Sequence, residues 1–318
     1  MTTTTTKKSR VERSINFHPS NTRPALVIMA AGRARRYGAI KPLAPVGLNG
    51  EVLIDLIAQE ALTAGFREFV IVVNEDSGPI IAEHIRRRWW SKLSVTLVIQ
   101  SKTNGTLGAV LAAKQALLAG RCFAVANADD LYGVHAMTSL FEYLRDERTS
   151  AAVGYQIGNA VVGELPVNRG TCQVENGRLT DISERRGVRK VAGAFLVDDG
   201  DAPETLSADT LVSMNLWGFT YGVLKDMKAA YDAHDFEVGA ELNLPEFVNA
   251  NLGATLDVKL IETTSRCIGV THPQDLAEVQ HILNPNAVMP APAVAHVKVV
   301  TTCDTAPAVE IKSGLVLV

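Results

Sequence analysis

The stretch that decides the fold is ALVIMAAGRARRYGAIKPLAPVG, residues 25–47. Its short apolar run, residues 25–30, predicts a strand. The loop that follows holds Gly32 and Gly38 together with the cations Arg33, Arg35, Arg36 and Lys41. Backbone N–H groups freed by glycine, in the company of cations, suit an anionic chain of phosphates. The loop completes neither the P-loop pattern nor the G-x-G-x-x-G pattern of dinucleotide sites, and a solvated basic loop is the alternative interpretation.

Outward from this stretch, helical and strand-like patterns alternate. A helical pattern over residues 51–64 ends at Gly65, the position of a helix C-cap, and a β-branched run at 69–73 follows it. The same reasoning predicts helices at 79–90 and 106–119 and strands at 95–100 and 122–126. This βαβ progression predicts a mainly parallel sheet with right-handed crossovers and a ligand crevice at the carboxyl ends of its strands.

The pattern changes after residue 150. Shorter strand-like pieces and turn signals such as ENG, residues 175–177, predict an antiparallel region, and helical patterns return at 223–233 and 273–283. Residues 1–22 are polar throughout and are expected to be disordered. Residues 285–318 form a tail rich in Pro and Ala, whose two β-like runs, VKVVTT and GLVLV, are candidates for edge strands or a subunit contact.

The composition excludes several classes of protein. Of the 318 residues, 47% are hydrophobic and 20% charged, which is enough to fill a sizeable core. Lys and Arg total 31 against 34 for Asp and Glu, so the net charge of -3 gives no global attraction for nucleic acid. The apolar runs are shorter than the roughly 18 residues that span a membrane, and the N-terminus lacks the apolar segment of a secretion signal. We therefore expect a cytoplasmic protein whose four scattered cysteines are reduced.

A second polar signal is NADD, residues 127–130, directly after the strand predicted at 122–126. Carboxylates at the end of a parallel strand can hold Mg²⁺ through one or two oxygens while a nucleotide supplies the other ligands. The alternative is that Asp caps the N-terminus of the following helix. Together with the loop after the first strand, NADD predicts a site for a metal–nucleotide complex.

Seven segments carry a resemblance to a known family. They are LVIMAAGRARRYGAIKPLAPVG, NGTLGAVLAAK, AVANADDLYG, ISERR, VSMNLWGFT, ELNLPEFVN and CIGVTHPQDL. Over residues 24–283 the chain thereby resembles the sugar-phosphate nucleotidyltransferases, or NDP-sugar pyrophosphorylases. The resemblance implies a Rossmann-like nucleotidyltransferase domain over residues 23–284, α/β with a mainly parallel central sheet and a smaller antiparallel substrate-binding region. It also implies Mg²⁺-dependent joining of a nucleoside triphosphate to a sugar 1-phosphate, with release of pyrophosphate.

The resemblance implies roles for residues on the nucleotide side. The implied nucleotide contacts are Ala30, Ala31, Gly32, Arg33, Ala34, Gln100, Gly105 and Thr106. Arg36 and Lys41 match the cations that neutralise charge as the α-phosphorus is attacked. Asp129 matches the metal-binding Asp. Gln100 and Gly105 match positions that read the base, although a polar strand end would equally explain Gln100; they do not select one base, and UTP or dTTP is the preferred interpretation.

On the sugar side, Glu184 and Arg185 match a Glu-Lys pair whose cation grips the sugar phosphate, and Arg can bind a phosphate through two parallel hydrogen bonds. Asn215 and Glu241 match residues that hydrogen-bond sugar hydroxyls. The neighbouring aromatic residues, Trp217 and Phe219, are expected in the core. RRRWW, residues 86–90, is expected to be a helix end with cations near its C-terminal dipole rather than a nucleic-acid contact.

Two departures from the family pattern keep alternatives open. Ala34 and Arg35 replace a glycine and a small hydroxyl residue, and Gly269 stands where many relatives have a second metal-binding Asp. One alternative is transfer to another phosphate, such as a cyclitol phosphate, phosphocholine or a phosphonate. Another is a nucleotide-binding homologue with impaired catalysis. A glycosyltransferase of related fold is the third, and the predicted phosphate loop argues against it.

Overall fold

The structure is a computed structural model that describes residues 23–32, 40–47, 50–89, 93–102, 104–161, 165–236, 241–269 and 296–301. Several predicted features lie outside the described residues. They are Arg33, Ala34 and Arg36 of the phosphate loop, segment 1–22, the helix at 273–283, and the tail 285–318 apart from residues 296–301.

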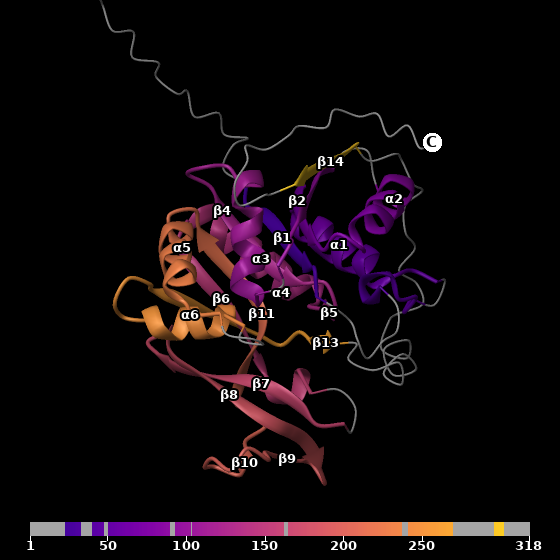
Figure 1. Ribbon diagram of the computed structural model, residues 1–318. Coiled ribbons are helices and arrows are strands. Elements are labelled where there is room, and N and C mark those ends of the chain that lie inside the picture. Colours follow the sequence, from indigo (N-terminus) through magenta and orange to yellow (C-terminus); the bar gives the residue numbers. More distant parts are fainter. Residues whose placement is uncertain are drawn as a thin grey trace, which may run out of the picture.

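A 12-stranded sheet runs through the described chain, and one half of it is parallel (Figure 1). The first four strands of this half are β1 (Ala25–Ala30), β2 (Glu68–Val73), β3 (Ser94–Ile99) and β4 (Cys122–Asn127). They lie in the order β3-β2-β1-β4, and β14 (His296–Thr301) pairs in parallel with β3. The chain therefore changes direction across the sheet between β1 and β4, which creates a crevice at their carboxyl ends.

The other half of the sheet is largely antiparallel. Its strands are β6 (Ser150–Gln156), β7 (Val167–Glu175), β8 (Arg178–Val191), β9 (Ala194–Leu196), β10 (Thr205–Leu206), β11 (Leu211–Thr220) and β12 (Val258–Thr263). Strand β11 pairs antiparallel with both β4 and β6, and it joins the two halves. Figure 1 shows β7 and β8 extending away from the helices, with β9 and β10 at the far end. The predicted antiparallel region is thus a continuation of the parallel sheet.

Helices cover both faces of the sheet. One face carries α1 (Leu53–Ala64), α2 (Gly78–Arg88) and α4 (Val134–Asp146). The other carries α3 (Thr106–Ala113), α5 (Val223–Ala233) and α6 (Leu244–Asn251). Strand β1 contributes side chains to the hydrophobic cores on both faces of the sheet: Leu26 and Ile28 pack in the first core and Val27 in the second. Full burial of such a side chain contributes about 1.5–3 kcal/mol. Because successive side chains of the strand are buried on opposite faces, helices must cover both, which gives three layers: helices, sheet and helices.

Short elements complete the described chain. Strand β5 (Asp130–Leu131) pairs with β13 (Ile268–Gly269) in a separate two-stranded sheet. The 3-10 helices are η2 (Lys41–Leu43), η3 (Lys114–Ala116) and η4 (Ile157–Asn159). None of the helices in the described ranges has the length and apolar character needed to cross a bilayer.

Several local predictions are confirmed. Gly65 ends α1 in the left-handed conformation with φ +117°, as its C-cap position predicts. The last turn of α2 carries the arginines of RRRWW, and Trp89 is fully buried behind it. The helix predicted over residues 106–119 is shorter, because α3 gives way to η3 after Ala113 and the chain then becomes extended at Leu117, whose side chain is buried.

Candidate active site

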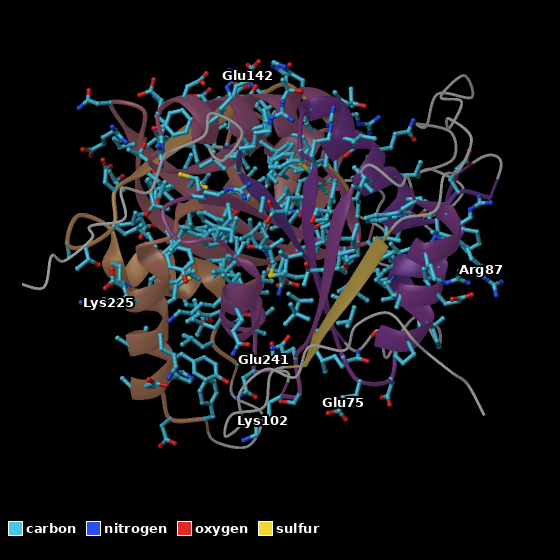
Figure 2. All side chains as sticks on the ribbon, turned by 90° about the horizontal axis from the view of Figure 1, so that it is seen from above. Glu75, Arg87, Lys102, Glu142, Lys225 and Glu241 are labelled. Atoms are coloured by element: carbon cyan, nitrogen blue, oxygen red, sulfur yellow. The ribbon has the colours of Figure 1, made fainter. Side chains whose placement is uncertain are left out.

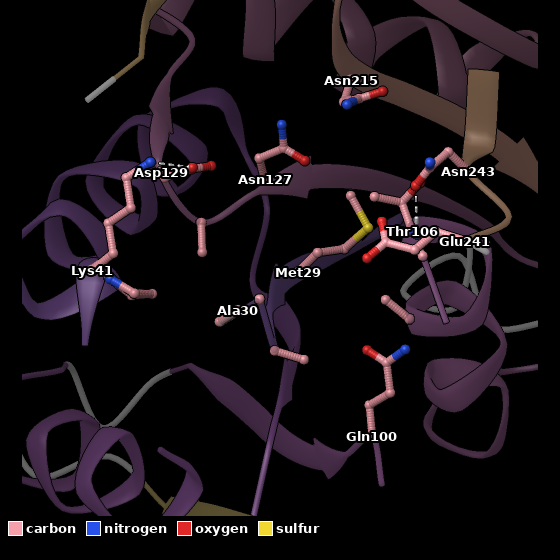
Figure 3. Close-up of a pocket in the computed structure, with 16 residues that line it drawn as sticks. Met29, Ala30, Lys41, Gln100, Thr106, Asn127, Asp129, Asn215, Glu241 and Asn243 are labelled. Carbon is pink, nitrogen blue, oxygen red and sulfur yellow. Dashed lines mark hydrogen bonds and ion pairs between the residues drawn. The ribbon is translucent and has the colours of Figure 1, made fainter. Parts of the chain in front are cut away.

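A large cavity in the described chain opens at the carboxyl ends of the parallel strands. Its volume is about 770 Å³, and its lining includes the ends of β1, β3 and β4 (Figure 3). A second cavity of about 340 Å³ adjoins it on the side of β7, β8 and β11. The two share Thr106, Asn127, Asp129, Asn215 and Asn243. They therefore form one groove, whose larger part we call the first lobe and whose smaller part we call the second lobe.

The loop after β1 forms part of the first lobe. Ala30, Ala31 and Gly32, three of the predicted nucleotide contacts, line it. The side-chain amide of Asn74 donates to the carbonyl oxygen of Ala31 at 3.1 Å, which holds the loop to the end of β2. A Cβ atom added at Gly32 would meet no atom within 4 Å, so the backbone here is open to close approach by a ligand.

Lys41 and Asp129 meet in the groove although 88 positions separate them in sequence. The Lys41 ammonium lies 2.6 Å from the Asp129 carboxylate, and 38% of the Asp129 side chain is exposed. Figure 3 shows the pair on one side of the cavity. Neither Asp of NADD caps α4, which begins at Val134 after Gly133, so the N-cap interpretation is wrong.

The carboxylate next to Asp129 is held differently. Asp130 is buried and accepts a hydrogen bond of 2.8 Å from the side-chain amide of Asn127. Burial, with the nearby charge of Asp129, raises the pKa of Asp130 to about 6. Below it, Glu60 accepts the backbone N–H of Tyr132 at 3.0 Å, and burial raises the pKa of Glu60 to about 7. These inner carboxylates hold the loop that presents Asp129.

The donor set fits a magnesium ion that arrives with its nucleotide. Among the described residues, no group of three or more His, Cys, Asp or Glu side chains could cage a metal. Mg²⁺ prefers hard oxygen ligands and is usually held by one or two carboxylates together with substrate phosphates. The partly exposed carboxylate of Asp129 meets that requirement. Gly269, at the predicted second metal position, lies opposite Asp130 and offers no side chain.

Gln100 lies at the other end of the first lobe from Lys41 (Figure 3), and Gly105 also lines this lobe. Gln100 follows β3 and is only 7% exposed, and its buried Nε2 atom has no hydrogen-bond partner. An unpaired buried donor costs about 1–3 kcal/mol, so a ligand that accepts this hydrogen bond would be favoured here. Gly105 has φ +89°, and a Cβ atom would lie 2.3 Å from the carbonyl oxygen of Leu242, so only glycine fits.

Thr106 lines both lobes at the start of α3. Its backbone N–H donates to the side-chain oxygen of Asn243 at 3.1 Å, and its hydroxyl accepts the N–H of Leu244 at 2.8 Å. Asn243 in turn donates its backbone N–H to Glu246 at 3.0 Å. Asn243 was not among the predicted site residues, although its spacing to Glu246 is typical of the start of a capped helix.

Asn215 also lines both lobes, and its role in substrate binding remains a prediction. It lies at an irregularity of β11, between Ser213 and Trp217, with a positive φ of +59° that costs a non-glycine residue about 1–3 kcal/mol. The indole N–H of Trp217 donates to the Asn215 side-chain oxygen at 3.1 Å. The amide nitrogen of Asn215 is then the end available to the groove. Trp217 and Phe219 are fully buried, as expected of core residues.

Glu184 and Arg185, which were predicted to act as a pair, lie in different surroundings. Glu184 is exposed and lines the second lobe, and its role in substrate binding remains a prediction. Arg185 is buried elsewhere: its Nε donates to Asp199 at 2.8 Å, and its Nη2 donates to the carbonyl oxygen of Pro203 at 2.9 Å. This pairing holds the pKa of Asp199 below its usual range. Arg185 lines neither lobe, and its guanidinium is engaged by these partners, so the prediction that it grips a phosphate in the groove is wrong.

A different arginine lies in the second lobe. Arg169 of β7 lines it and donates from Nε and Nη2 to the carbonyl oxygen of Ala160, at 3.2 and 2.8 Å. Burial lowers the pKa of Arg169. No spacing or motif in the sequence singled this residue out.

Glu241 lines the first lobe but not the second, so it lies on a different side of the groove from Glu184. A backbone hydrogen bond of 3.2 Å from Leu242 to Asn104 keeps it beside the segment that follows β3. Figure 2 shows Glu241 on the same edge of the molecule as Lys102 and Glu75. Its predicted contact with a sugar hydroxyl therefore remains a prediction, and its position is nearer to the Gln100 end.

Comparison with known families gives one match. The model of the MobA-like NTP transferase domain matches residues 26–193, more than half of the chain. No curated protein matches the sequence significantly.

Solved structures share the fold at low sequence identity. A putative glucose-1-phosphate thymidylyltransferase from Bacillus anthracis superposes with a TM-score of 0.60 at 12% identity, covering 84% of this chain and 97% of the other. The inositol-1-phosphate CTP transferase from T. maritima has a TM-score of 0.59 at 12% identity, with coverages of 83% and 98%. A UDP-glucose pyrophosphorylase complexed with UDP-glucose has a TM-score of 0.59 at 15% identity, with coverages of 82% and 98%. These similarities confirm the predicted α/β nucleotidyltransferase fold.

Proposed function

Since this chain belongs to the family of MobA-like NTP transferase domains and is a nucleotidyltransferase, we propose that it joins a nucleoside triphosphate to a sugar 1-phosphate. The products are an NDP-sugar and pyrophosphate. The observation that carries the proposal is the position of the Lys41–Asp129 pair in one continuous groove. On one side lies the unpaired amide of Gln100, and on the other lie Asn215 and Glu184.

The chemistry needs no nucleophile from the protein. An oxygen of the sugar phosphate attacks the α-phosphorus of the nucleotide in line and forms a new P–O bond. The bond from the α-phosphorus to the α,β-bridging oxygen breaks, and pyrophosphate carries away the electron pair. The protein's task is therefore to position two anions and to offset their charge.

We assign roles to several of the residues that line the groove and that the sequence singled out. The Gln100 amide donates to a carbonyl oxygen of the base, and the backbone of Ala30–Gly32 follows the phosphates. Lys41 offsets charge on the α-phosphate as attack proceeds. Mg²⁺, which we propose as the metal, would be held by Asp129 and would neutralise phosphate charge when bound. Asn215 and Glu184 orient the acceptor. Arg36, outside the described residues, keeps its proposed role as a second cation.

The names of the structural neighbours guide the choice of substrates. Thymidylyl, cytidylyl and uridylyl transfer are all represented, and the named acceptors include glucose 1-phosphate and inositol 1-phosphate. This supports a pyrimidine nucleotide, of which UTP or dTTP is our first choice. We also propose that the enzyme acts in the cytoplasm, on the sequence observations given above.

The test is pyrophosphate release by the purified protein with Mg²⁺, each nucleoside triphosphate in turn, and a panel of phosphate acceptors. The panel contains sugar 1-phosphates, inositol 1-phosphate, phosphocholine and a phosphonate. We expect release with one pyrimidine nucleotide and a sugar 1-phosphate. Release with a non-sugar acceptor alone would contradict the proposed acceptor. Silence across the panel, with one nucleotide still raising the melting temperature, would indicate a binding protein that has lost catalysis.

A further inference from the structure

The charge of the second lobe is strongly one-sided. Its described lining contains four carboxylates, which are Asp129, Asp130, Glu184 and Glu246. Against them stands one cation, Arg169. An acceptor that brings its own phosphate into this lobe would meet repulsion from every charged neighbour except Arg169. Arg169 is therefore the described lining residue of the second lobe that can attract an anionic group by its charge.

The Arg169 guanidinium is fixed but not neutralised. Three hydrogen bonds hold it, two to the carbonyl oxygen of Ala160 and one of 2.7 Å to that of Asn168. Guanidinium has five N–H donors, so one donor on each Nη atom is left over. No carboxylate of the described chain lies within 4.0 Å of it, whereas Arg185 on the neighbouring strand has Asp199 at 2.8 Å.

A partly buried cation without a carboxylate partner is an unusual feature. Buried charges are normally paired, because burial disfavours the charged form. Burial indeed lowers the pKa of Arg169, and only the more distant charge of Asp130 and of Cys267 acts against this. The carbonyl contacts orient the guanidinium rather than balance its charge. Two N–H donors of Arg169 are thus left for an anion that can accept both.

We propose that Arg169 binds the phosphate of the acceptor substrate in the second lobe, in place of Arg185. This inference rests on the proposed function, since it takes the acceptor to be a phosphate ester. The two free donors form the fork that suits bidentate binding of phosphate oxygens. Glu184 and Glu246 line the same lobe and then face the remainder of the acceptor, where carboxylates accept hydrogen bonds from hydroxyl groups.

The test uses inorganic phosphate as the probe and needs no turnover. Phosphate is titrated calorimetrically into the full-length protein without nucleotide or metal. The variants are Arg169→Met, Arg185→Met and Arg178→Met. Arg178 lies at the opposite end of β8, is partly exposed and pairs with Asp257, so its variant controls for the loss of one positive charge.

We expect Arg169→Met to weaken phosphate binding at least about tenfold, the loss typical of a charge-assisted hydrogen bond. Arg185→Met should lower the melting temperature, because Asp199 loses its partner, and should leave phosphate affinity unchanged. Equal affinities for wild type and Arg169→Met would overturn the proposal, and so would loss of binding in Arg185→Met alone. Should Arg169→Met fail to fold, Arg169→Lys keeps the charge, loses the fork and is expected to bind phosphate severalfold more weakly.

A kinetic measurement separates this inference from the proposed function. With the substrate pair found by pyrophosphate release, Arg169→Met should raise the KM of the acceptor about tenfold and leave the KM of the nucleotide unchanged. An equal rise in both KM values would show a merely structural role and contradict the inference. If no pair reacts, the proposed function fails, and the phosphate titration still decides whether Arg169 is an anion site.

Discussion

The two lobes of the groove are built by different kinds of sheet. The first lobe lies at the carboxyl ends of parallel strands, where β1, β3 and β4 each deliver a polar loop to the same edge. The second lobe lies against the antiparallel strands β7, β8 and β11, and its groups depend on strand faces and on an irregularity at Asn215. In the proposed scheme, the parallel half therefore provides one common place for the nucleotide, while single side-chain orientations in the antiparallel half select the acceptor.

The largest expected effect concerns the junction between the lobes. Asp129→Asn removes the charge that would hold the metal and leaves Lys41 without its partner. We expect kcat to fall by at least about a hundredfold, the scale seen when an electrostatic group at a reacting centre is lost. Steady-state pyrophosphate release measures the effect. Asp232→Asn, which breaks the exposed pair with Lys228 on α5, is the matched control and should leave kcat unchanged.

A near-normal kcat for Asp129→Asn, with the melting temperature preserved, would show that Asp129 does not act at the reacting centre. The reaction would then not take place where the two lobes meet.

In the proposed scheme, the first lobe binds the nucleotide and the second lobe binds the acceptor, so variants in the two lobes should change different KM values. Gln100→Leu removes the unpaired donor at the base end, and we expect the KM of the nucleotide to rise about tenfold while the KM of the acceptor stays unchanged. Glu184→Gln is the mirror variant in the second lobe and should raise only the KM of the acceptor. Initial rates with each substrate varied in turn measure both. If either variant raises both KM values equally, the lobes do not divide the substrates as described.

A smaller effect is expected from the irregularity of β11. Trp217→Phe keeps an aromatic six-membered ring in the core but removes the indole N–H that holds the side-chain oxygen of Asn215. The Asn215 amide can then turn over, so we expect the KM of the acceptor to rise severalfold. At least about 1 kcal/mol should be lost from the free energy of unfolding, because the hydrogen bond and part of the buried side chain are both removed. Phe219→Leu is the control, since it disturbs the same core without touching this hydrogen bond. An unchanged KM for Trp217→Phe would show that the indole does not orient the amide.

The smallest effect on activity is expected at Glu60, which holds the loop that presents Asp129. The effect expected there is a pH-dependent change in stability. The pKa of Glu60 is about 7 in the folded protein against an ordinary 4.5, so the folded state binds its proton more tightly than the unfolded state. This contribution to stability is fully present below about pH 4.5 and is lost as the pH rises through about 7. Glu60→Gln should therefore gain stability over wild type as the pH rises, by at most about 3 kcal/mol.

Urea unfolding of both proteins at about pH 5 and about pH 8 measures this difference. A constant gap between the two curves at both pH values would contradict the raised pKa of Glu60.

The sequence predicted the parallel half of the sheet well, because its strands and helix ends are recognised from short local patterns. The apolar run at Ala25–Ala30 gave β1 with the same bounds, and Gly65 caps α1 as its position indicated. Parallel strands end at one edge, so Lys41, Gln100 and Asp129 were expected to meet without knowledge of any contact. Residues 33–39 of the loop after β1 lie outside the described residues.

The antiparallel half was less predictable because strand register decides which face a side chain occupies. A shift of one residue exchanges the faces, so the motif ISERR could not say whether Glu184 or Arg185 faces the groove. Arg185 became a structural partner of Asp199 instead. Arg169 carries no sequence signal, because a lone arginine in a strand is usually a solvated residue. Its position emerges only when β7 and the segment after β6 are folded together.

The most direct test of nucleotidyl transfer in this groove follows the α-phosphate itself. A nucleoside triphosphate labelled at its α-phosphorus is incubated with Mg²⁺, the protein and the acceptor identified by pyrophosphate release. We predict that the label passes into a product joined to the acceptor, in equal amount to the pyrophosphate set free, and that it does so only when the acceptor is present. Label recovered as nucleoside monophosphate, or transfer of the γ-phosphate instead, would contradict the account.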